Sequence, residues 1–303
     1  MKLALGPNLY YWTQDVLQEF YAAIANSPVD IVYLGETVCS RRHLMRLPDW
    51  LELAQKLTDA GKEVVLSTQT LIESESDLKT LRRITDNKTF RVEANDMGAA
   101  RLLNEQGIPF IAGQTLNIYN PLTLNLIAKL GAMRWVLPVE MSREALAPMQ
   151  RARLDGMETE VFAYGRMPLA FSARCFTARH YNLPKDDCQF RCIDHADGLT
   201  LKTREGEAFL VLNGIQTQSA KVYNLLGELP GLQEASVDIL RISPQALHTP
   251  RIVQLFRDAM DGLTTPQQAL QQMQKFMPEA ACDGYWHGKP GLEHLYAANM
   301  ADA

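Results

Sequence analysis

The chain has 303 residues, 47% of them hydrophobic, which is enough to bury a sizeable core. Its formal net charge of −5, from 35 acidic and 30 basic residues, provides no overall positive field to attract a nucleic acid. The opening run MKLALGPNLYYW carries one lysine and is broken by Gly6 and Pro7, unlike a signal peptide, and no apolar stretch is long enough to cross a bilayer. We therefore expect a cytoplasmic protein that is not an integral membrane protein and binds no nucleic acid.

Eight short runs rich in apolar and β-branched residues are typical of strands, and a helical pattern follows most of them. The strands are expected at residues 3–6, 30–35, 63–68, 90–95, 109–113, 134–140, 160–165 and 237–243. The helices between them are expected at residues 12–25, 47–60, 76–85, 96–106, 121–130 and 142–151. Gly61, Gly107 and Gly131 each stand shortly before a predicted strand, where a glycine commonly ends a helix.

This alternation of strands and helices predicts the fold class. Strands separated by helices pair in parallel through right-handed crossovers. Eight such units without a nucleotide-binding fingerprint favour a closed (β/α)8 barrel, a TIM-like α/β fold, over an open doubly wound sheet. We expect residues 1–303 to form one barrel domain.

The region between the seventh and eighth predicted strands breaks the alternation. We expect an insertion at about 166–232 that carries a cluster of cysteines and a hairpin, GLTLKTREGEAFLVLNG, with Glu205 and Gly206 at its turn. After the eighth strand, residues 250–263 and 266–277 are predicted helices, and the remainder of the C-terminal region to residue 303 is rich in turns.

Four of the five cysteines are the strongest functional signal. Cys188 and Cys192 have a Cys-x3-Cys spacing, which puts two sulfurs on one side of a turn, and Cys175 is close in sequence. Cys39 follows the second strand and Cys175 follows the seventh, so both loops open on the carboxyl face of the barrel. Only the eighth and first strands separate these two loops around a closed barrel. We therefore predict Cys39, Cys175, Cys188 and Cys192 as the ligands of one metal centre, with Cys282 outside it.

The spacing alone leaves the nature of this centre open. Four thiolates suit both a structural zinc ion and an iron–sulfur cluster. A cluster with four cysteinate ligands is negatively charged, and the basic residues around the cysteines favour it: Arg174, Arg179, His180, Lys185 and Arg191. A third alternative is a group of reduced core thiols, because free cysteine is among the most often buried residues.

The segment ETEVFAYGRMPLAFSARCF resembles the signature of peptidase family U32. In that signature a Glu-x-Phe-x-x-Gly strand end precedes two cysteines. Glu160, Phe162 and Gly165 match the strand end, and Cys175 falls at the position of the second cysteine.

The chain also departs from this signature. Pro168 stands where the first cysteine belongs, while Cys188 and Cys192 resemble the downstream pair of the family. A cluster would then lack one ligand, and Cys39 on the facing loop is the candidate replacement.

The resemblance extends along the whole chain, through LALGPNLYYW and YLGETVCSRRH, to U32 members of oxygen-independent ubiquinone biosynthesis. It implies a [4Fe-4S] cluster and a role as a subunit of an anaerobic hydroxylase. It further implies a heterodimer with a second U32 protein, a hydrophobic quinone precursor as substrate and a lipid-binding accessory partner.

Other functions remain as alternatives. The chain could be a non-catalytic electron-relay or structural subunit, an RNA-hydroxylation factor, or a peptidase, although it has no His-Glu-x-x-His motif. The sequence identifies no catalytic residue. Polar residues at or just past the strand ends are expected to line a pocket at the barrel mouth: Thr68, Gln69, Glu93, Asn95, Gln114, Asn117, Glu140 and Arg166.

Overall fold

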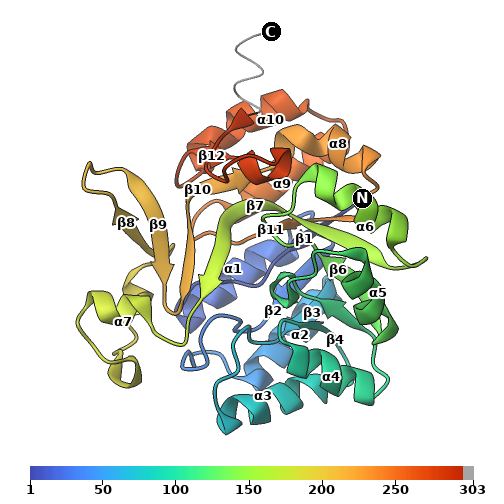
Figure 1. Ribbon diagram of the computed structural model, residues 1–303. Helices are drawn as coiled ribbons and strands as arrows, with labels where there is room; N and C mark the ends of the chain where they lie inside the picture. The colour runs from blue at the N-terminus through green and yellow to red at the C-terminus, as the bar shows by residue number, and fades with distance from the viewer. Residues whose placement is uncertain (296–303) are drawn as a thin grey trace.

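A computed structural model describes residues 1–295 and contains a closed barrel of eight parallel strands (Figure 1). Each barrel strand pairs with the next in chain order, and the last pairs with both the seventh and the first, so the barrel has no open edge. The strands are β1 (Lys2–Leu5), β2 (Ile31–Leu34), β3 (Glu63–Ser67), β4 (Arg91–Ala94), β5 (Phe110–Ala112), β6 (Ala132–Val136), β7 (Glu158–Phe171) and β11 (Ile239–Ile242). The predicted TIM-like barrel is confirmed.

Helices surround the barrel (Figure 1). They are α1 (Gln14–Ala25), α2 (Leu47–Asp59), α3 (Glu75–Thr85), α4 (Met97–Glu105), α5 (Pro121–Lys129), α6 (Arg143–Ala152), α8 (Leu229–Glu234), α9 (Thr249–Met260) and α10 (Pro266–Met273). All eight helices predicted from the sequence are present, and the glycines predicted at helix ends, Gly61, Gly107 and Gly131, have the positive φ that favours glycine. Within residues 1–295, no helix is both long and apolar enough to cross a membrane.

Apolar side chains form two layers, one on each face of the strands. The outer layer lies between the strands and the helices and includes Leu34 and Leu66. The inner layer fills the barrel and consists of Ala4, Ile31, Tyr33, Val65, Ile111, Val136 and Ile239. This separation follows from the alternation of side chains along a strand, which sends neighbouring residues to opposite faces.

A buried ion-pair network shares the barrel interior with these apolar residues. The Arg241 Nε atom lies 2.6 Å from Glu160 Oε1, and an Nη atom of the same guanidinium lies 2.8 Å from Glu93 Oε1. The guanidinium also lies 4.1 Å from the ring centroid of Tyr33, whose hydroxyl donates a 2.5 Å hydrogen bond to Glu160. Burial alone lowers the pKa of Arg241, but the two carboxylates outweigh it and hold that pKa above its ordinary value.

Strand β7 is longer than the sequence predicts. The prediction ends it at residue 165, whereas the strand continues to Phe171, where it pairs antiparallel with β10 (Gln216–Asn224). A Cβ atom on Gly165 would lie 2.5 Å from the Cβ atom of Ser243, so glycine is required at this point, where its φ is +128°. The extension was not predicted because its pairing partner, β10, lies some fifty residues away in the sequence.

The chain between β7 and β11 contains α7 (Phe176–His180), β8 (Leu199–Lys202), β9 (Ala208–Asn213) and β10. Strands β8 and β9 form the predicted hairpin, which extends away from the barrel together with α7 (Figure 1). A short strand, β12 (Ala281–Cys282), pairs with β10. Of the C-terminal region predicted to residue 303, residues 296–303 lie outside the described residues.

Candidate functional site

The loop that follows β2 is folded around a buried carboxylate. Gly35 begins it at a φ of +128°, where a Cβ atom would lie 2.7 Å from the carbonyl oxygen of Ser67. The Glu36 Oε1 atom accepts hydrogen bonds from the backbone N–H groups of Val38 and Cys39, at 2.9 and 3.0 Å. These bonds orient the segment that carries the Cys39 thiol.

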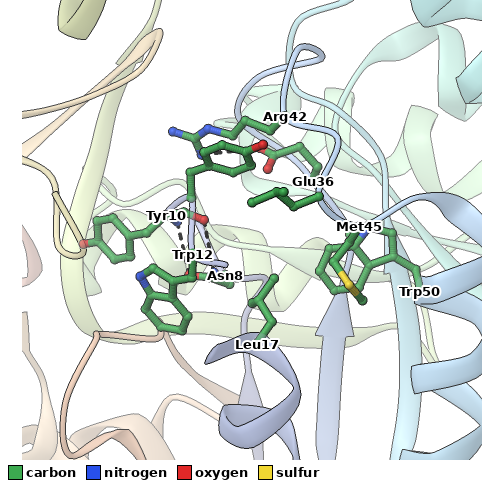
Figure 2. Close-up of a pocket in the computed structure, with 11 residues that line it drawn as sticks. Asn8, Tyr10, Trp12, Leu17, Glu36, Arg42, Met45 and Trp50 are labelled. Atoms are coloured by element: carbon green, nitrogen blue, oxygen red, sulfur yellow. Dashed lines mark hydrogen bonds and ion pairs between the residues drawn. The ribbon is translucent and has the colours of Figure 1, made fainter. Parts of the chain in front are cut away.

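Arg42 connects this loop to two other parts of the chain. Its guanidinium lies 3.5 Å from Glu36 and donates hydrogen bonds to the carbonyl oxygen of Leu9, at 2.8 Å, and to Asn213 Oδ1, at 2.7 Å. It also lies over the ring of Tyr11, 5.5 Å from the centroid. Figure 2 shows the Arg42 side chain beside the Glu36 carboxylate. The N-terminal segment, the loop after β2 and the end of β9 therefore meet at one buried guanidinium.

Three of the four predicted ligand thiols lie at this rim of the barrel. Electrostatic interaction with Cys175 affects the pKa of both Cys39 and Cys192. Cys39 and Cys175 also pack against one small apolar cluster, formed by Leu9, Val38 and Ile215. The loops that follow β2 and β7, which are far apart in the sequence, thus lie together.

Burial changes the acidity of two of these thiols. It raises the pKa of Cys39 to about 11 and also raises the pKa of Cys192, while the positive charge of Arg42 opposes both shifts. Arg42 is also within hydrogen-bonding reach of Cys192. Without a cation, both groups are therefore neutral thiols near pH 7, and a metal that binds them has to displace their protons.

The fourth predicted ligand, Cys188, is partly buried between two short 3-10 turns, η2 (Lys185–Asp187) and η3 (Arg191–Asp194). Arg41 ties this segment to the loop after β2, because its guanidinium donates a 2.6 Å hydrogen bond to the carbonyl oxygen of Asp186. As placed, no group of three or more His, Cys, Asp or Glu residues within 1–295 is arranged to hold a metal ion. The four thiols supply the type of donor that a thiolate-ligated centre needs, but they are not arranged as one, so the centre stays a prediction.

The polar residues predicted at the barrel mouth do not share one pocket. Gln114, Asn117 and Glu140 line a cavity of about 260 Å³ together with residues 168–171 of β7. Glu140 also accepts a 2.9 Å hydrogen bond from the hydroxyl of Tyr119. Gln69 lines a different cavity, between the barrel and the helices α2 and α3.

The remaining predicted pocket residues are engaged with the protein itself. Asn95 donates two 2.9 Å hydrogen bonds to Thr68, from its backbone N–H to the hydroxyl and from its side-chain amide to the carbonyl oxygen, and Glu93 pairs with Arg241 inside the barrel. The Arg166 guanidinium donates hydrogen bonds to main-chain carbonyl oxygens of β10. The sequence did not single out Arg241, although a lone arginine in the apolar run VDILRIS is the expected signal of a charge inside a barrel.

Cys282 lies apart from the other cysteines, on β12, with none of its surface exposed. Burial raises its pKa to about 12. We expect iodoacetamide near pH 7 to leave Cys282 unmodified in the folded, metal-free protein, because only the exposed thiolate reacts. The partly exposed cysteines serve as internal controls, and peptide mapping by mass spectrometry locates the modification. Labelling of Cys282 at the rate of Cys188, before denaturant is added, would contradict this prediction.

A family model described as Peptidase family U32 matches residues 16–296. The chain belongs to peptidase family U32. The U32 chain is 29% identical over 220 residues to a protein named Uncharacterized protease MJ0090, from Methanocaldococcus jannaschii. That match covers 68% of this chain and 53% of the other protein, so the U32 chain spans about half the length of this curated relative.

Solved structures with a similar fold include the U32 peptidase Mk0906, with a TM-score of 0.46 and 12% identity over 81% of this chain and 93% of that one. A fructose-1,6-bisphosphate aldolase from Coccidioides immitis has a TM-score of 0.38, 12% identity and coverages of 91% and 90%. A dihydrodipicolinate synthase from Agrobacterium tumefaciens has a TM-score of 0.35, 12% identity and coverages of 89% and 78%. None of these similarities bears on the chemistry of the U32 chain.

Proposed function

We propose that this U32 chain is an iron–sulfur protein of the UbiV type, a subunit of an oxygen-independent hydroxylase in ubiquinone biosynthesis. It works as a heterodimer with a UbiU-like U32 protein. One observation carries the proposal: Cys39, from the loop after β2, lies with Cys175 and Cys192 at one rim of the barrel. That placement supports Cys39 as the replacement for the signature cysteine where Pro168 stands.

The proposed cofactor is a [4Fe-4S] cluster held by Cys39, Cys175, Cys188 and Cys192. Such a cluster supplies one-electron transfer. The protein contributes the surroundings of the thiols. Glu36 holds the backbone at Cys39, and the Arg42 guanidinium places a positive charge beside Cys192, which favours the thiolate form and offsets the negative charge of a cysteinate-ligated cluster.

The proposed substrate is a hydrophobic quinone precursor, delivered with the help of a lipid-binding accessory protein. The cavity of about 260 Å³ at the barrel mouth is the candidate site for its reacting end, because it lies outside the carboxyl ends of the strands. Pro168, the residue that replaces the signature cysteine, lines this cavity. The loss of that cysteine therefore removes a thiol from the mouth of the barrel.

Protein purified without air tests the cofactor directly. We expect about four iron atoms and about four acid-labile sulfides per chain, as the stoichiometry of a cubane requires, with a brown colour that air bleaches. Metal and sulfide analysis, with the EPR spectrum after reduction, measures this. A result of one zinc ion per chain would instead indicate a structural metal site. A result of no metal would indicate four reduced thiols.

Quinone content in cells tests the pathway. In a bacterium that depends on this chain, we expect deletion to abolish ubiquinone during growth without oxygen and to leave it unchanged in air. The intact chain should restore ubiquinone, and a variant that holds no iron should not. Unchanged ubiquinone under both conditions would reject the hydroxylase role and favour the peptidase or RNA-hydroxylation alternatives. Activity of the UbiU-like protein alone would make this chain the non-catalytic relay subunit.

A further inference from the structure

A second cavity, of about 520 Å³, lies between the barrel wall and the helices α2 and α3. Leu34 and Leu66 from the strands, with Trp50 and Ile84 from the helices, supply apolar walls. Met45 and Trp50, both drawn in Figure 2, line this cavity and the smaller pocket beside it. The volume falls within the range of about 300 to 1,000 Å³ that is typical of small-molecule sites.

The acidic residues around this cavity have hydrogen-bond partners within the protein, whereas the side chains of two of its arginines have none within residues 1–295. Glu36 is bonded to two backbone N–H groups and to Arg42, and Asp77 accepts hydrogen bonds from two backbone N–H groups at the start of α3. Arg46 and Arg83 also line the cavity and are exposed, and neither side chain has an ion pair or hydrogen bond with any residue in 1–295. The acidic groups are therefore occupied, while two guanidinium groups are free to bind a ligand.

Other arginines in this part of the chain form ion pairs, unlike Arg46 and Arg83. Arg82, next to Arg83 on α3, lies 3.0 Å from Glu75, and Arg91 lies 3.1 Å from Glu63. A single arginine that faces solvent is common, but two free arginines on one cavity with partly apolar walls combine the two features of a site for an amphipathic anion. Guanidinium groups bind carboxylates through paired N–H donors, and the apolar walls exclude water from the remainder of the ligand.

We propose that this cavity binds a small organic acid, a carboxylate carried on an apolar ring or chain. Its carboxylate is held by Arg46 and Arg83, and its apolar part lies against Trp50 and the leucines of the barrel wall. Ser40, which directly follows Cys39, also lines the cavity, so the ligand would lie beside the loop of the proposed cluster. The site goes beyond the proposed function and does not depend on it, because the lining from residues 1–295 contains no cysteine.

Isothermal titration calorimetry with three matched probes tests the proposal. The probes are 4-phenylbutyrate, its neutral amide and 4-phenylbutylamine, which share one apolar body and differ in charge. We expect the acid to bind about tenfold more tightly than the amide at low ionic strength, because each exposed arginine contributes a modest charge–charge attraction. The amine should bind most weakly. No heat of binding for the acid at millimolar concentration, or equal binding of acid and amide, would overturn the proposal.

Variants locate the site. The double substitution Arg46→Gln and Arg83→Gln should weaken binding of the acid about tenfold and leave binding of the amide unchanged. Arg82→Gln, on the same helix but off the cavity, is the matched control and should change neither. Thr80→Trp places a large side chain at the exposed edge of the cavity and should abolish binding of both probes while the melting temperature stays close to that of the parent. Equal effects of the double variant and Arg82→Gln would overturn the assignment.

The same titrations separate this proposal from the cluster. Binding of the acid should be the same for protein purified without air and for protein whose metal has been removed. Equal binding of the acid and the amide by parent protein that retains its iron would reject only the cavity proposal. If the protein contains no iron but still binds the acid more tightly than the amide, only the cluster proposal is rejected.

Discussion

Replacement of Cys39 by alanine is expected to remove most of the iron and the brown colour from protein purified without air. A cubane needs four ligands, and the substitution leaves Cys175, Cys188 and Cys192. The loss should be as large as that caused by alanine at any of these three positions, although Cys39 lies more than a hundred residues away in the sequence. Iron analysis and the absorption spectrum of each variant measure the effect.

Cys282→Ala is the matched control, because it removes a thiol from the same chain at a site where no ligand is expected. Its iron content should equal that of the parent, and both variants should remain folded by circular dichroism. Retention of iron by Cys39→Ala would show that the loop after β2 contributes no ligand. Loss of iron from Cys282→Ala alone, with a normal fold, would place the centre on β12.

Replacement of Arg241 by methionine is expected to lower the free energy of unfolding by about 3 to 5 kcal/mol, the range for breaking a buried ion pair. Glu93 and Glu160 are 1% and 0% exposed at their side chains, so removal of the guanidinium leaves two carboxylates in the barrel without their principal counter-ion. Urea unfolding measures the change through a lower midpoint at an unchanged slope.

Two controls isolate the buried charge as the cause. Arg91→Met removes a surface guanidinium that pairs with Glu63, and it should cost less than about 1 kcal/mol. The triple substitution Arg241→Met, Glu93→Gln and Glu160→Gln should recover most of the lost stability, since it removes the carboxylate charges together with the cation. A cost below about 1 kcal/mol for Arg241→Met alone would show that water reaches these carboxylates or that Arg134 compensates them.

The network also explains part of the family signature in physical terms. Glu160 is the carboxylate that holds Arg241 and Tyr33 inside the barrel, and Gly165 provides the close approach to Ser243 where β7 continues past the barrel. These two signature positions therefore serve the architecture of the barrel. The residue that differs from the signature, Pro168, lies further along β7, where the strand borders the cavity at the mouth.

Part of the geometry around the candidate site could be predicted, whereas its role as a metal centre stays a prediction. Counting strands around a closed barrel placed the loops of Cys39 and Cys175 on one rim, and the structure brings these loops together. The partnership of Glu36 with Arg42, and of Arg42 with Asn213, could not be predicted, because it depends on how the N-terminal segment, the loop after β2 and the end of β9 pack. The identity of the metal depends on chemistry that neither spacing nor packing specifies.

What the sequence by itself determined is the barrel. Apolar runs of strand length that alternate with amphipathic helices allow little else, because each element has one local periodicity and each crossover has one hand. Only the tertiary structure decided how far β7 extends, which carboxylates neutralise Arg241, and how the polar residues at the strand ends are divided between two cavities. These features depend on strand register and on contacts between segments that are distant in the chain, and a local pattern of residues carries no information about either.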